Sequence, residues 1–403
     1  RWGEFALRGY GEAQLYDQTF SAIAPSRQTE TLTSLQRVPA QEAGYSLQWT
    51  RLWGARQTWV AGADGMAVRG ASNALSYRSG KASSATGPGG RQDINGVYAE
   101  DLIRPASRWI VTVNGRFDDW RNFDGLSTTR TLAPPGPAAV TNFTPRSASA
   151  FSPHVSVLRQ VTSSASVYAS FYQAFRAPTL NELYRPYRVG DVLTAANSAL
   201  DAERLTGEEV GGSYAPLRDR LRVHATLFWD DIRQPIENVT LATMPTLITE
   251  QRQNLGSTRS RGAELEADTE LRPSVMLSGG YQFTDARVLS FPANTALQGL
   301  FVPQVPKNVV TLQTRYTRNS LFTLALQGRY MGRQYDDDLN QFPLSPAFEL
   351  DAFASHSFKQ HAEIYGAVEN LTGQRYQVAR VPYTQVGPPV LFRIGFRFNW
   401  GVR

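Results

Sequence analysis

Residues 392–400 read Phe-Arg-Ile-Gly-Phe-Arg-Phe-Asn-Trp, and this stretch decides the fold class. Its apolar residues occupy every second position, and arginine, glycine or asparagine fills the positions between them. Successive side chains of an extended chain point to opposite sides, whereas a helix would spread these residues around its circumference. The stretch therefore predicts a β-strand with one apolar face and one polar face.

The same alternation recurs upstream, most clearly in residues 221–230, 275–284 and 322–330. The connections between such segments are of two kinds, which alternate along the chain. Short connections are expected near residues 54–55, 105–107, 163–164, 218–219, 272–273, 319–320 and 359–360. Long connections, rich in Gly, Pro, Ser, Asn or Asp, are expected at residues 22–40, 69–90, 124–148, 176–203, 241–247, 286–304, 336–345 and 373–389. This order predicts about sixteen antiparallel strands joined as hairpins.

Short turns at one end of the strands and long loops at the other are typical of outer-membrane barrels. A closed sheet also gives every backbone polar group a partner in lipid. We therefore predict an all-β fold, a transmembrane antiparallel up-and-down β-barrel. A soluble β-sandwich or propeller also has alternating strands, but the polar faces here carry many Arg, Glu, Gln and Gly residues for a packed interior. No repeat of the propeller type is visible either.

Composition narrows the classes of function. The chain has 403 residues, 19% of them charged, a formal net charge of +6 and no cysteine, which excludes disulfides and thiolate metal sites. It has no uninterrupted apolar run of about 18 residues, as a helical membrane span would need. Without a Lys/Arg block, nucleic acid is not an expected partner. The chain begins Arg1-Trp2 with no apolar leader, so we expect its first residue to be internal to a longer protein.

Four stretches carry more specific motifs. Residues 96–101 read GVYAED and are followed by VNGRFD at 113–118. Residues 175–184 read FRAPTLNELY and lead to Glu203. The third stretch runs from NLG at 254–256 to RGAELE at 261–266, and the fourth is VENLT at 368–372. Together with the C-terminal strand, these motifs resemble TonB-dependent receptors, the active importers of the Gram-negative outer membrane.

The resemblance implies particular motif positions. Those that match this sequence are Arg176, Pro178, Leu180, Glu182, Leu183, Tyr184, Glu203, Asn254, Gly262, Glu264, Glu266, Glu369, Asn370 and Leu371. The chain departs from the family where Ser198 and Ala202 replace the usual prolines. We interpret the matching residues as architectural rather than as substrate contacts, because the chemistry they offer is strand pairing and charge compensation.

Alternation assigns faces to the third motif. Glu264 and Glu266 share a face with Gly262, so their carboxylates are expected to face a polar lumen, since a carboxylate in lipid is costly. Arg259 and Arg261 are expected on the neighbouring part of the same polar face, in lumenal ion pairs.

Gly395, Phe398 and Trp400 resemble the terminal signal by which the barrel assembly machinery recognises outer-membrane barrels, although the chain continues to Arg403. The resemblance also implies a barrel of about twenty-two strands around an N-terminal plug, which carries the motif that engages TonB. We find neither the plug, with its TonB box, nor the first six strands. Residues 1–403 are therefore expected to be a partial barrel domain with both termini on the short-turn side. The alternative is closure as a porin-sized barrel of about sixteen strands.

No catalytic or metal site is expected. The histidines, His154, His224, His356 and His361, are scattered over different strands and lack metal-ligand spacing. The run Asp336-Asp337-Asp338 could hold a hard cation such as calcium, but a solvated loop tip is the favoured interpretation. We expect no cofactor and no enzymatic activity.

The predicted loop 176–203 combines aromatic and cationic residues, namely Tyr184, Arg185, Tyr187 and Arg188. These suit a ferric siderophore or another bulky anion, through charge-assisted hydrogen bonds and stacking. The other interpretation is a loop that packs on its neighbours.

The leading functional hypothesis is an outer-membrane receptor that imports a ferric siderophore, cobalamin or an oligosaccharide with TonB energy. Its expected partners are outer-membrane lipid, the barrel assembly machinery, the small-molecule ligand and, through the missing plug, the TonB complex. A passive porin-like channel and a structural or adhesive surface barrel are the alternatives.

Overall fold

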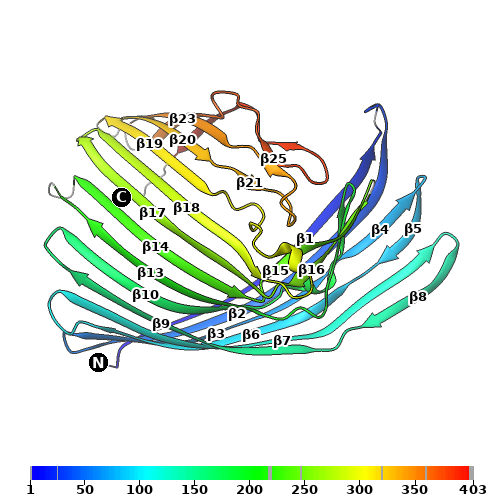
Figure 1. The fold of residues 1–403 in the computed structure, drawn as a ribbon, viewed down its shortest axis with the longest axis horizontal. Helices are drawn as coiled ribbons and strands as arrows, with labels where there is room; N and C mark the ends of the chain where they lie inside the picture. The colour runs from blue at the N-terminus through cyan, green and yellow to red at the C-terminus, as the bar shows by residue number, and fades with distance from the viewer. Residues whose placement is uncertain are drawn as a thin grey trace. The chain divides into compact units, whose positions relative to one another are not determined.

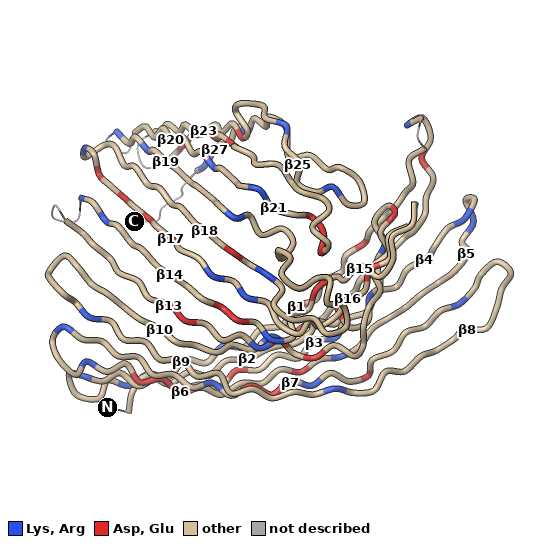
Figure 2. Tube along the Cα trace, in the orientation of Figure 1, with Lys and Arg blue, Asp and Glu red and all other residues tan. Residues whose placement is uncertain are grey.

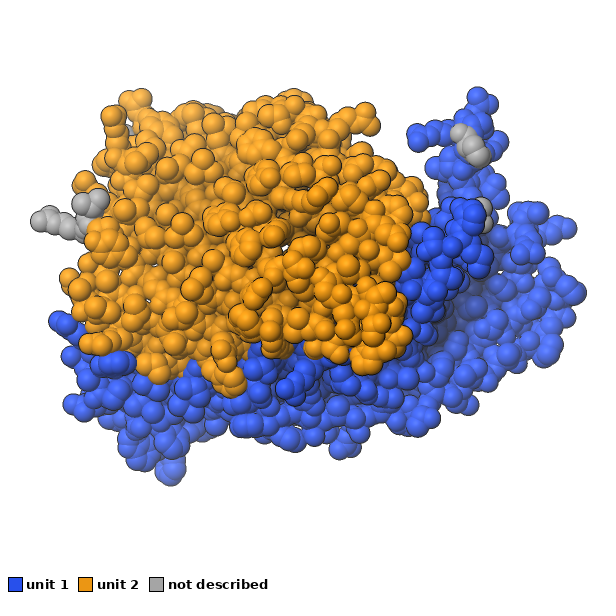
Figure 3. Space-filling view, in the orientation of Figure 1, with its two compact units in different colours: residues 1–155, 172–206, 232–256 blue, residues 156–171, 207–231, 257–403 orange. Residues whose placement is uncertain are grey.

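The computed structural model describes residues 2–24, 26–216, 220–245, 247–318, 321–358 and 361–398. The chain divides into two compact units, which Figure 3 shows in different colours. Unit 1 comprises residues 1–155, 172–206 and 232–256, and unit 2 comprises residues 156–171, 207–231 and 257–403.

Unit 1 is built from long antiparallel strands and a group of short elements. Its elements are β1 (Glu4–Ile23), β2 (Glu30–Trp53), β3 (Gln57–Ala71), β4 (Asn73–Arg78), β5 (Lys81–Thr86), β6 (Gly89–Ile103), β7 (Trp109–Leu132), β8 (Pro135–Asn142), α1 (Leu180–Tyr184), β11 (Tyr187–Val189), β12 (Val192–Ala195), β15 (Ile236–Met244) and β16 (Leu247–Asn254). Four strands contribute residues to both units: β9 (Arg146–Gln160), β10 (Ala165–Arg176), β13 (Glu203–Tyr214) and β14 (Leu221–Arg233).

Unit 2 continues the same pattern of hairpins. Its elements are β17 (Ser257–Arg272), β18 (Val275–Ser290), the 3-10 helix η1 (Thr295–Leu297), β19 (Asn308–Arg318), β20 (Phe322–Met331), β21 (Gln334–Tyr335), β22 (Pro343–Leu344), β23 (Ala347–Phe358), β24 (Ala362–Glu369), β25 (Gln377–Ala379), β26 (Gln385–Val386) and β27 (Leu391–Phe398). Figure 1 shows β17, β18, β19, β20 and β23 running side by side.

Strand pairing confirms the predicted hairpins. In unit 1, β1 pairs with β2 from Glu4 opposite Thr50 to Ile23 opposite Glu30. In unit 2, β17 pairs with β18, β18 with β19, β19 with β20, and β20 with β23, all antiparallel. The predicted short turns at 54–55, 105–107 and 163–164 fall between strands, and the one predicted at 272–273 is displaced by one residue, because Arg272 is the last residue of β17. Those predicted at 218–219, 319–320 and 359–360 lie outside the described residues.

The C-terminal strand has the two faces that its sequence predicts. Phe392 and Ile394 are 76% and 85% exposed, as expected for apolar side chains that no other part of the described chain covers. The alternate positions Arg393 and Arg397 form ion pairs with β24, each with a nitrogen–oxygen distance of 3.0 Å. The apolar face of this sheet is therefore bare, and the polar face is charge-compensated.

Several of the predicted long loops are wrong. Of residues 22–40, most belong to β1 and β2, because β2 already begins at Glu30. Residues 69–90 hold β4 and β5, and residues 124–148 hold the end of β7 and all of β8. Backbone pairing with neighbouring strands holds these segments, and they contain many small or polar residues, so their period-two alternation is a weak signal.

The face predicted for Arg259 and Arg261 is also wrong. In the β17–β18 register Arg261 lies opposite Asp285, whereas Gly262 lies opposite Thr284. Directly opposed residues share a face and the period is two, so both arginines lie on the face of Leu265, opposite to that of Glu264. They do form ion pairs, but with Asp231 and Asp285 on the apolar side of the sheet.

A small core in unit 1 lies where α1 meets the strands. It contains Trp120, Leu183, Tyr184 and Leu200, all at most 4% exposed. Partly buried hydrophobic residues surround it, among them Ile94, Phe143, Phe175 and Ile236. This cluster anchors the segment between β10 and β13. Within the residues described above, no helix has the length and apolarity that crossing a membrane requires.

Candidate functional site

An ion network fixes the start of the segment that joins β10 to β13 in unit 1. Arg176 donates from Nε and Nη2 to the two carboxylate oxygens of Glu203, at 2.5 and 2.6 Å. Its Nη1 donates to both oxygens of Glu182 at 3.1 Å. Glu203 also accepts the backbone N–H of Ile236 at 2.6 Å. One guanidinium therefore joins the end of β10, α1 and β13.

The same glutamate caps the short helix. Thr179 accepts the backbone N–H of Glu182 through Oγ1 at 3.2 Å, and Glu182 accepts the backbone N–H of Thr179 at 2.7 Å. This is a capping box, which satisfies backbone donors at the helix start. Just before it, the buried Pro178 accepts a hydrogen bond from Gln92 at 2.9 Å, so the turn is also tied to β6.

Tyr184 and Leu183 point into the core rather than into a ligand site. The Tyr184 hydroxyl donates to Asn122, and its ring stacks on Phe143 with centroids 5.1 Å apart. Burial raises the pKa of Tyr184 above its ordinary value, which keeps the phenol protonated. The ligand-binding role predicted for Tyr184 does not fit this placement, because the side chain is 4% exposed and already partnered.

Asn254 joins the other end of the segment to β16. Its side chain donates to the carbonyl oxygens of Asp201 and Gln234 at 3.0 and 2.8 Å, and accepts the Asp201 backbone N–H at 2.8 Å. Asp201 also pairs with Arg146. The motif residues of unit 1 thus form one connected scaffold, although their functional role stays a prediction.

Arg185 and Arg252 lie together on this scaffold. Arg185 donates from Nη2 to the side-chain oxygens of Gln18 and Gln36, at 2.9 and 2.6 Å. Arg252 donates to the carbonyl oxygens of Asn181 and Arg185. Burial and the charge of Arg252 lower the pKa of Arg185, and no described carboxylate acts on it to compensate. The two half-buried arginine side chains thus lie close together, and all their hydrogen-bond acceptors described above are uncharged oxygens.

The aromatic ring of Tyr187 lies beside these two arginines. The Arg252 guanidinium lies 5.1 Å from the ring centroid of Tyr187, and Asn238 donates to the Tyr187 hydroxyl at 3.2 Å. Arg188 is exposed, and its Nε donates to the carbonyl oxygen of Gly190 at 2.9 Å. We call the group of Arg185, Arg252 and Tyr187 the arginine pair site. Sequence reasoning named Arg185 and Tyr187 but missed Arg252, because nothing in the sequence of β16 links it to a loop more than sixty residues away.

The motif residues of unit 2 also take structural positions. A Cβ on Gly262 would meet the Phe283 carbonyl oxygen at 1.9 Å, so glycine is required for the close approach of β17 and β18. Glu264 accepts a hydrogen bond from Gln282 at 3.1 Å. Glu264 and Glu266 line a hollow on the polar face, together with Tyr168, Glu209, His224, Thr226, Phe228, Asp230, Ser260, Gln282 and Thr284.

The last motif closes β24. Asn370 is 1% exposed and has a positive φ of 50°. Its side chain donates to the carbonyl oxygens of Gln374 and Pro388, both at 3.0 Å. Glu369 pairs with Arg393, and the backbone N–H of Leu371 donates to Leu350. These hydrogen bonds give partners to backbone polar groups just after β24, where the chain reverses direction.

Two of the three residues of the predicted assembly signal, Gly395 and Phe398, lie within the described residues. A Cβ on Gly395 would meet the Tyr365 ring at 2.1 Å, so this glycine makes room for an aromatic ring on β24. Phe398 is 58% exposed on the apolar face. Trp400 lies outside the described residues.

Two of the three consecutive aspartates accept backbone hydrogen bonds, Asp337 within its own loop and Asp336 from residues 380–381. Asp336 accepts the backbone N–H groups of Arg380 and Val381 at 2.6 and 2.8 Å, and Asp337 accepts that of Phe342 at 2.8 Å. The described residues contain no group of three or more acidic, histidine or cysteine side chains placed to hold a metal ion.

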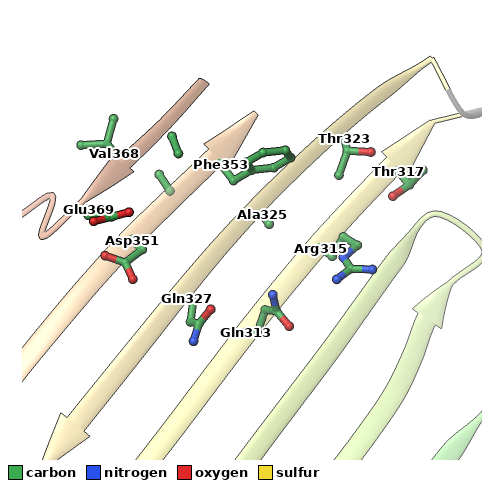
Figure 4. A pocket seen from close by; sticks show the side chains of 12 residues that line it. Gln313, Arg315, Thr317, Thr323, Ala325, Gln327, Asp351, Phe353, Val368 and Glu369 are labelled. Carbon is green, nitrogen blue, oxygen red and sulfur yellow. The ribbon is translucent and has the colours of Figure 1, made fainter. Parts of the chain in front are cut away.

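A second hollow lies on the polar face of β19, β20 and β23. Figure 4 shows Gln313 and Arg315 on β19 and Gln327 on the neighbouring β20, with Asp351 and Glu369 beyond them. Of the histidines, His224 stacks on Tyr168 with centroids 5.8 Å apart, and its Nδ1 lies 2.8 Å from the Ser213 hydroxyl. The other ring nitrogen of His224, Nε2, lies 3.1 Å from the Thr226 hydroxyl, so both ring nitrogens have hydroxyl partners.

Comparison with known proteins gives the family. Residues 2–371 match the family model described as TonB dependent receptor-like, beta-barrel. A probable TonB-dependent receptor of Bordetella pertussis, BfrD, is 22% identical over 319 residues, 76% of this chain and 41% of that protein. The probable TonB-dependent siderophore receptor PiuA of Acinetobacter baumannii is 22% identical over 290 residues, 70% of this chain and 37% of its own length. The chain thus spans about two fifths of the length of these relatives.

Solved structures agree on the fold. The ferric yersiniabactin uptake receptor FyuA of Yersinia pestis superposes with a TM-score of 0.75 at 17% identity, over 98% of this chain and 58% of that one. The copper transporter OprC reaches 0.73 at 15% identity, over 97% and 62%. The predicted all-β antiparallel fold of the outer-membrane barrel type is confirmed. The chain belongs to the family of TonB-dependent receptors.

Proposed function

We propose that this chain forms the barrel region of an outer-membrane receptor that imports a bulky, anionic ferric chelate with energy from the TonB system. The observation that carries the proposal is the arginine pair site, in which two guanidinium groups lie together without a described carboxylate. Guanidinium groups in such a place bind carboxylate or phosphate groups through charge-assisted hydrogen bonds.

The charge of the site favours one of the three cargo classes over the others. Cobalamin and neutral oligosaccharides would leave both guanidinium groups uncompensated. A ferric chelate built from catecholate or several carboxylate groups carries net negative charge over a broad surface. Its binding would offset the burial of Arg185, and Tyr187 could stack on its flat groups.

Relatives support this choice without deciding it. PiuA is named as a probable siderophore receptor and FyuA as a ferric yersiniabactin uptake receptor, but OprC, with the same fold, is a copper transporter. Fold alone therefore leaves the cargo open, and the positive charge of the arginine pair site is what selects an anion.

We place the protein in the outer membrane of a Gram-negative bacterium, with lipid against its apolar face. Phe392, Ile394 and Phe396 are more than half exposed, which water would penalise and hydrocarbon would not. The barrel assembly machinery would act on the C-terminal strand with Gly395, Phe398 and Trp400. The TonB complex would act through a plug domain, and residues 1–403 would supply a partial barrel domain without enzymatic activity.

Uptake of an iron-labelled chelate by intact cells tests the proposal. Cells that express the complete receptor should accumulate the chelate when TonB is present and should fail to do so in a tonB deletion strain. Uptake that continues without TonB would contradict energised import. Single-channel recording separates the passive alternative, because a large and steady conductance of the full-length protein would indicate an open porin-like channel.

A further inference from the structure

Four cationic side chains gather on the apolar face of unit 2, next to the long connection between β18 and β19. Arg259 and Arg287 face each other across β17 and β18, and Arg261 lies on the same face. Lys307 precedes β19, with its Nζ 5.7 Å from the ring centroid of Phe283. Figure 2 shows basic and acidic positions following one another near these ends of β17 and β18.

These charges border directly on the bare apolar surface. The pair Leu265 and Tyr281 lies on the same face, four residue pairs along the strands from Arg261 and Asp285. These two side chains are 46% and 41% exposed. Along one face of one hairpin the surface therefore changes from apolar to cationic within four residue pairs, roughly 13 Å. Such a boundary is where hydrocarbon gives way to headgroups.

Aromatic rings lie among the cations. The guanidinium groups of Arg259 and Arg261 are 4.5 and 5.4 Å from the Trp229 ring centroid. The Arg287 guanidinium is 4.1 Å from that of Phe301. The rings hold the planar groups in place, so less side-chain entropy would be lost when a further ligand binds them.

Two carboxylates neutralise only part of this charge. Asp231 accepts two hydrogen bonds from Arg259, at 2.6 and 2.7 Å. Asp285 is shared, because its oxygens lie 3.4 Å from Arg261 and 2.9 Å from Arg287. The cluster thus has four cations against two carboxylates among the described residues. The side chains of Arg261 and Arg287 keep 53% and 39% of their surface exposed.

We propose that Arg261, Arg287 and Lys307, the outer cation cluster, bind the phosphate group of a membrane lipid whose acyl chains lie on the apolar face beside Leu265. The proposal rests on the proposed function, because it needs the apolar face to contact lipid. Charge complementarity selects the ligand, since a phosphomonoester accepts hydrogen bonds from several guanidinium groups at once. A lumenal cargo cannot reach this face, which is opposite to that of Glu264.

Native mass spectrometry of the full-length protein in neutral detergent tests the site. The probes are dipalmitoyl phosphatidic acid and dipalmitoylglycerol, which differ only in the phosphate. The protein should retain phosphatidic acid more strongly. Arg261→Gln and Arg287→Gln should each weaken that retention by about fivefold, the effect of one cation near a membrane surface. Equal retention of the two lipids would overturn the proposal.

Two matched variants separate the site from a general effect of charge. Arg315→Gln removes an arginine from the opposite face of the same sheet and should leave lipid retention unchanged. Asp285→Asn removes the carboxylate that competes for Arg261 and Arg287, and should strengthen retention. A loss in Arg315→Gln equal to that in Arg261→Gln, or no gain in Asp285→Asn, would contradict the assignment. All variants are compared after circular dichroism shows equal strand content.

Inorganic phosphate distinguishes a lipid site from a soluble anion site. At millimolar concentration it should not displace phosphatidic acid, because it lacks the acyl chains. Complete displacement would overturn the lipid assignment.

Ferric-chelate binding measured on the same variants keeps the two proposals apart. Arg261→Gln should bind chelate normally, and Arg185→Gln should retain lipid normally. Loss of phosphatidic acid selectivity alone refutes the lipid site, and loss of chelate binding alone refutes the proposed cargo.

Discussion

Glu203 accepts both hydrogen bonds of a bidentate pair with Arg176, although the two residues are 27 positions apart in the chain. This pair closes the segment that holds α1 and the arginine pair site. The site exists because a guanidinium at the end of β10 and a carboxylate at the start of β13 hold that segment against the strands.

Replacing Arg176 should loosen this segment. Arg176→Gln leaves Glu182 and Glu203 facing each other without a cation, and we expect a local loss of about 1–2 kcal/mol, since the arginine is partly exposed. Cleavage of residues 176–203 by a dilute protease should then be about five to thirty times faster. Arg188→Gln, at an exposed arginine of the same segment, is the control. Equal cleavage of the two variants would contradict the role of the pair.

Gly262 should tolerate no side chain. A Cβ there would lie 1.9 Å from the Phe283 carbonyl oxygen, a backbone atom of the paired strand. We expect Gly262→Ala to destabilise the protein by about 1–3 kcal/mol and to lower the yield of folded protein. The matched control is Gly279→Ala on β18, where the nearest atoms would be 3.6 Å away. Similar thermal unfolding of the two variants would show that the close approach is not required.

Tyr184 should titrate later than a free tyrosine. Burial raises its pKa above the ordinary value of about 10. The folded state therefore holds the phenolic proton more tightly than the unfolded state does. That contribution to stability is fully present below pH about 10 and is lost as the pH rises through the raised pKa. Ultraviolet titration should show a late phase that loses the contribution of one tyrosine in Tyr184→Phe and is unchanged in Tyr383→Phe, at an exposed tyrosine. A titration curve unchanged in Tyr184→Phe would contradict this.

Much of the fold could be predicted because apolar alternation is a strong local signal. The strand from Phe392 to Phe398 and the turn near 272–273 are found from periodicity alone. The strands β4 and β5 are hard to predict, because each is only six residues long and both lie in a stretch rich in Gly, Ser and Ala. Arg261 lies on the face opposite to that of Gly262, as its odd spacing requires, although its charge favours the polar face.

The candidate site was harder to predict, because it is assembled from distant segments. The sequence motif that contains Glu182 indicated the scaffold, and Arg185 and Tyr187 follow it directly. Arg252, Gln18 and Gln36 come from three other strands, and only the folded chain brings them to Arg185. Contact between residues so far apart leaves no trace in a single sequence.

Calorimetric titration of the complete receptor tests the central claim most directly. The ligands are a set of anionic ferric chelates, cobalamin and neutral oligosaccharides, and the variants are Arg185→Gln and Arg252→Gln, with Arg130→Gln, at an exposed arginine of β7, as control. We expect at least one ferric chelate to bind, and each of the two site variants to weaken it by about tenfold or more, the loss of one charge-assisted hydrogen bond of about 1.5–3 kcal/mol. Binding of cobalamin or an oligosaccharide instead, or chelate binding that is unchanged in both site variants, would contradict the account.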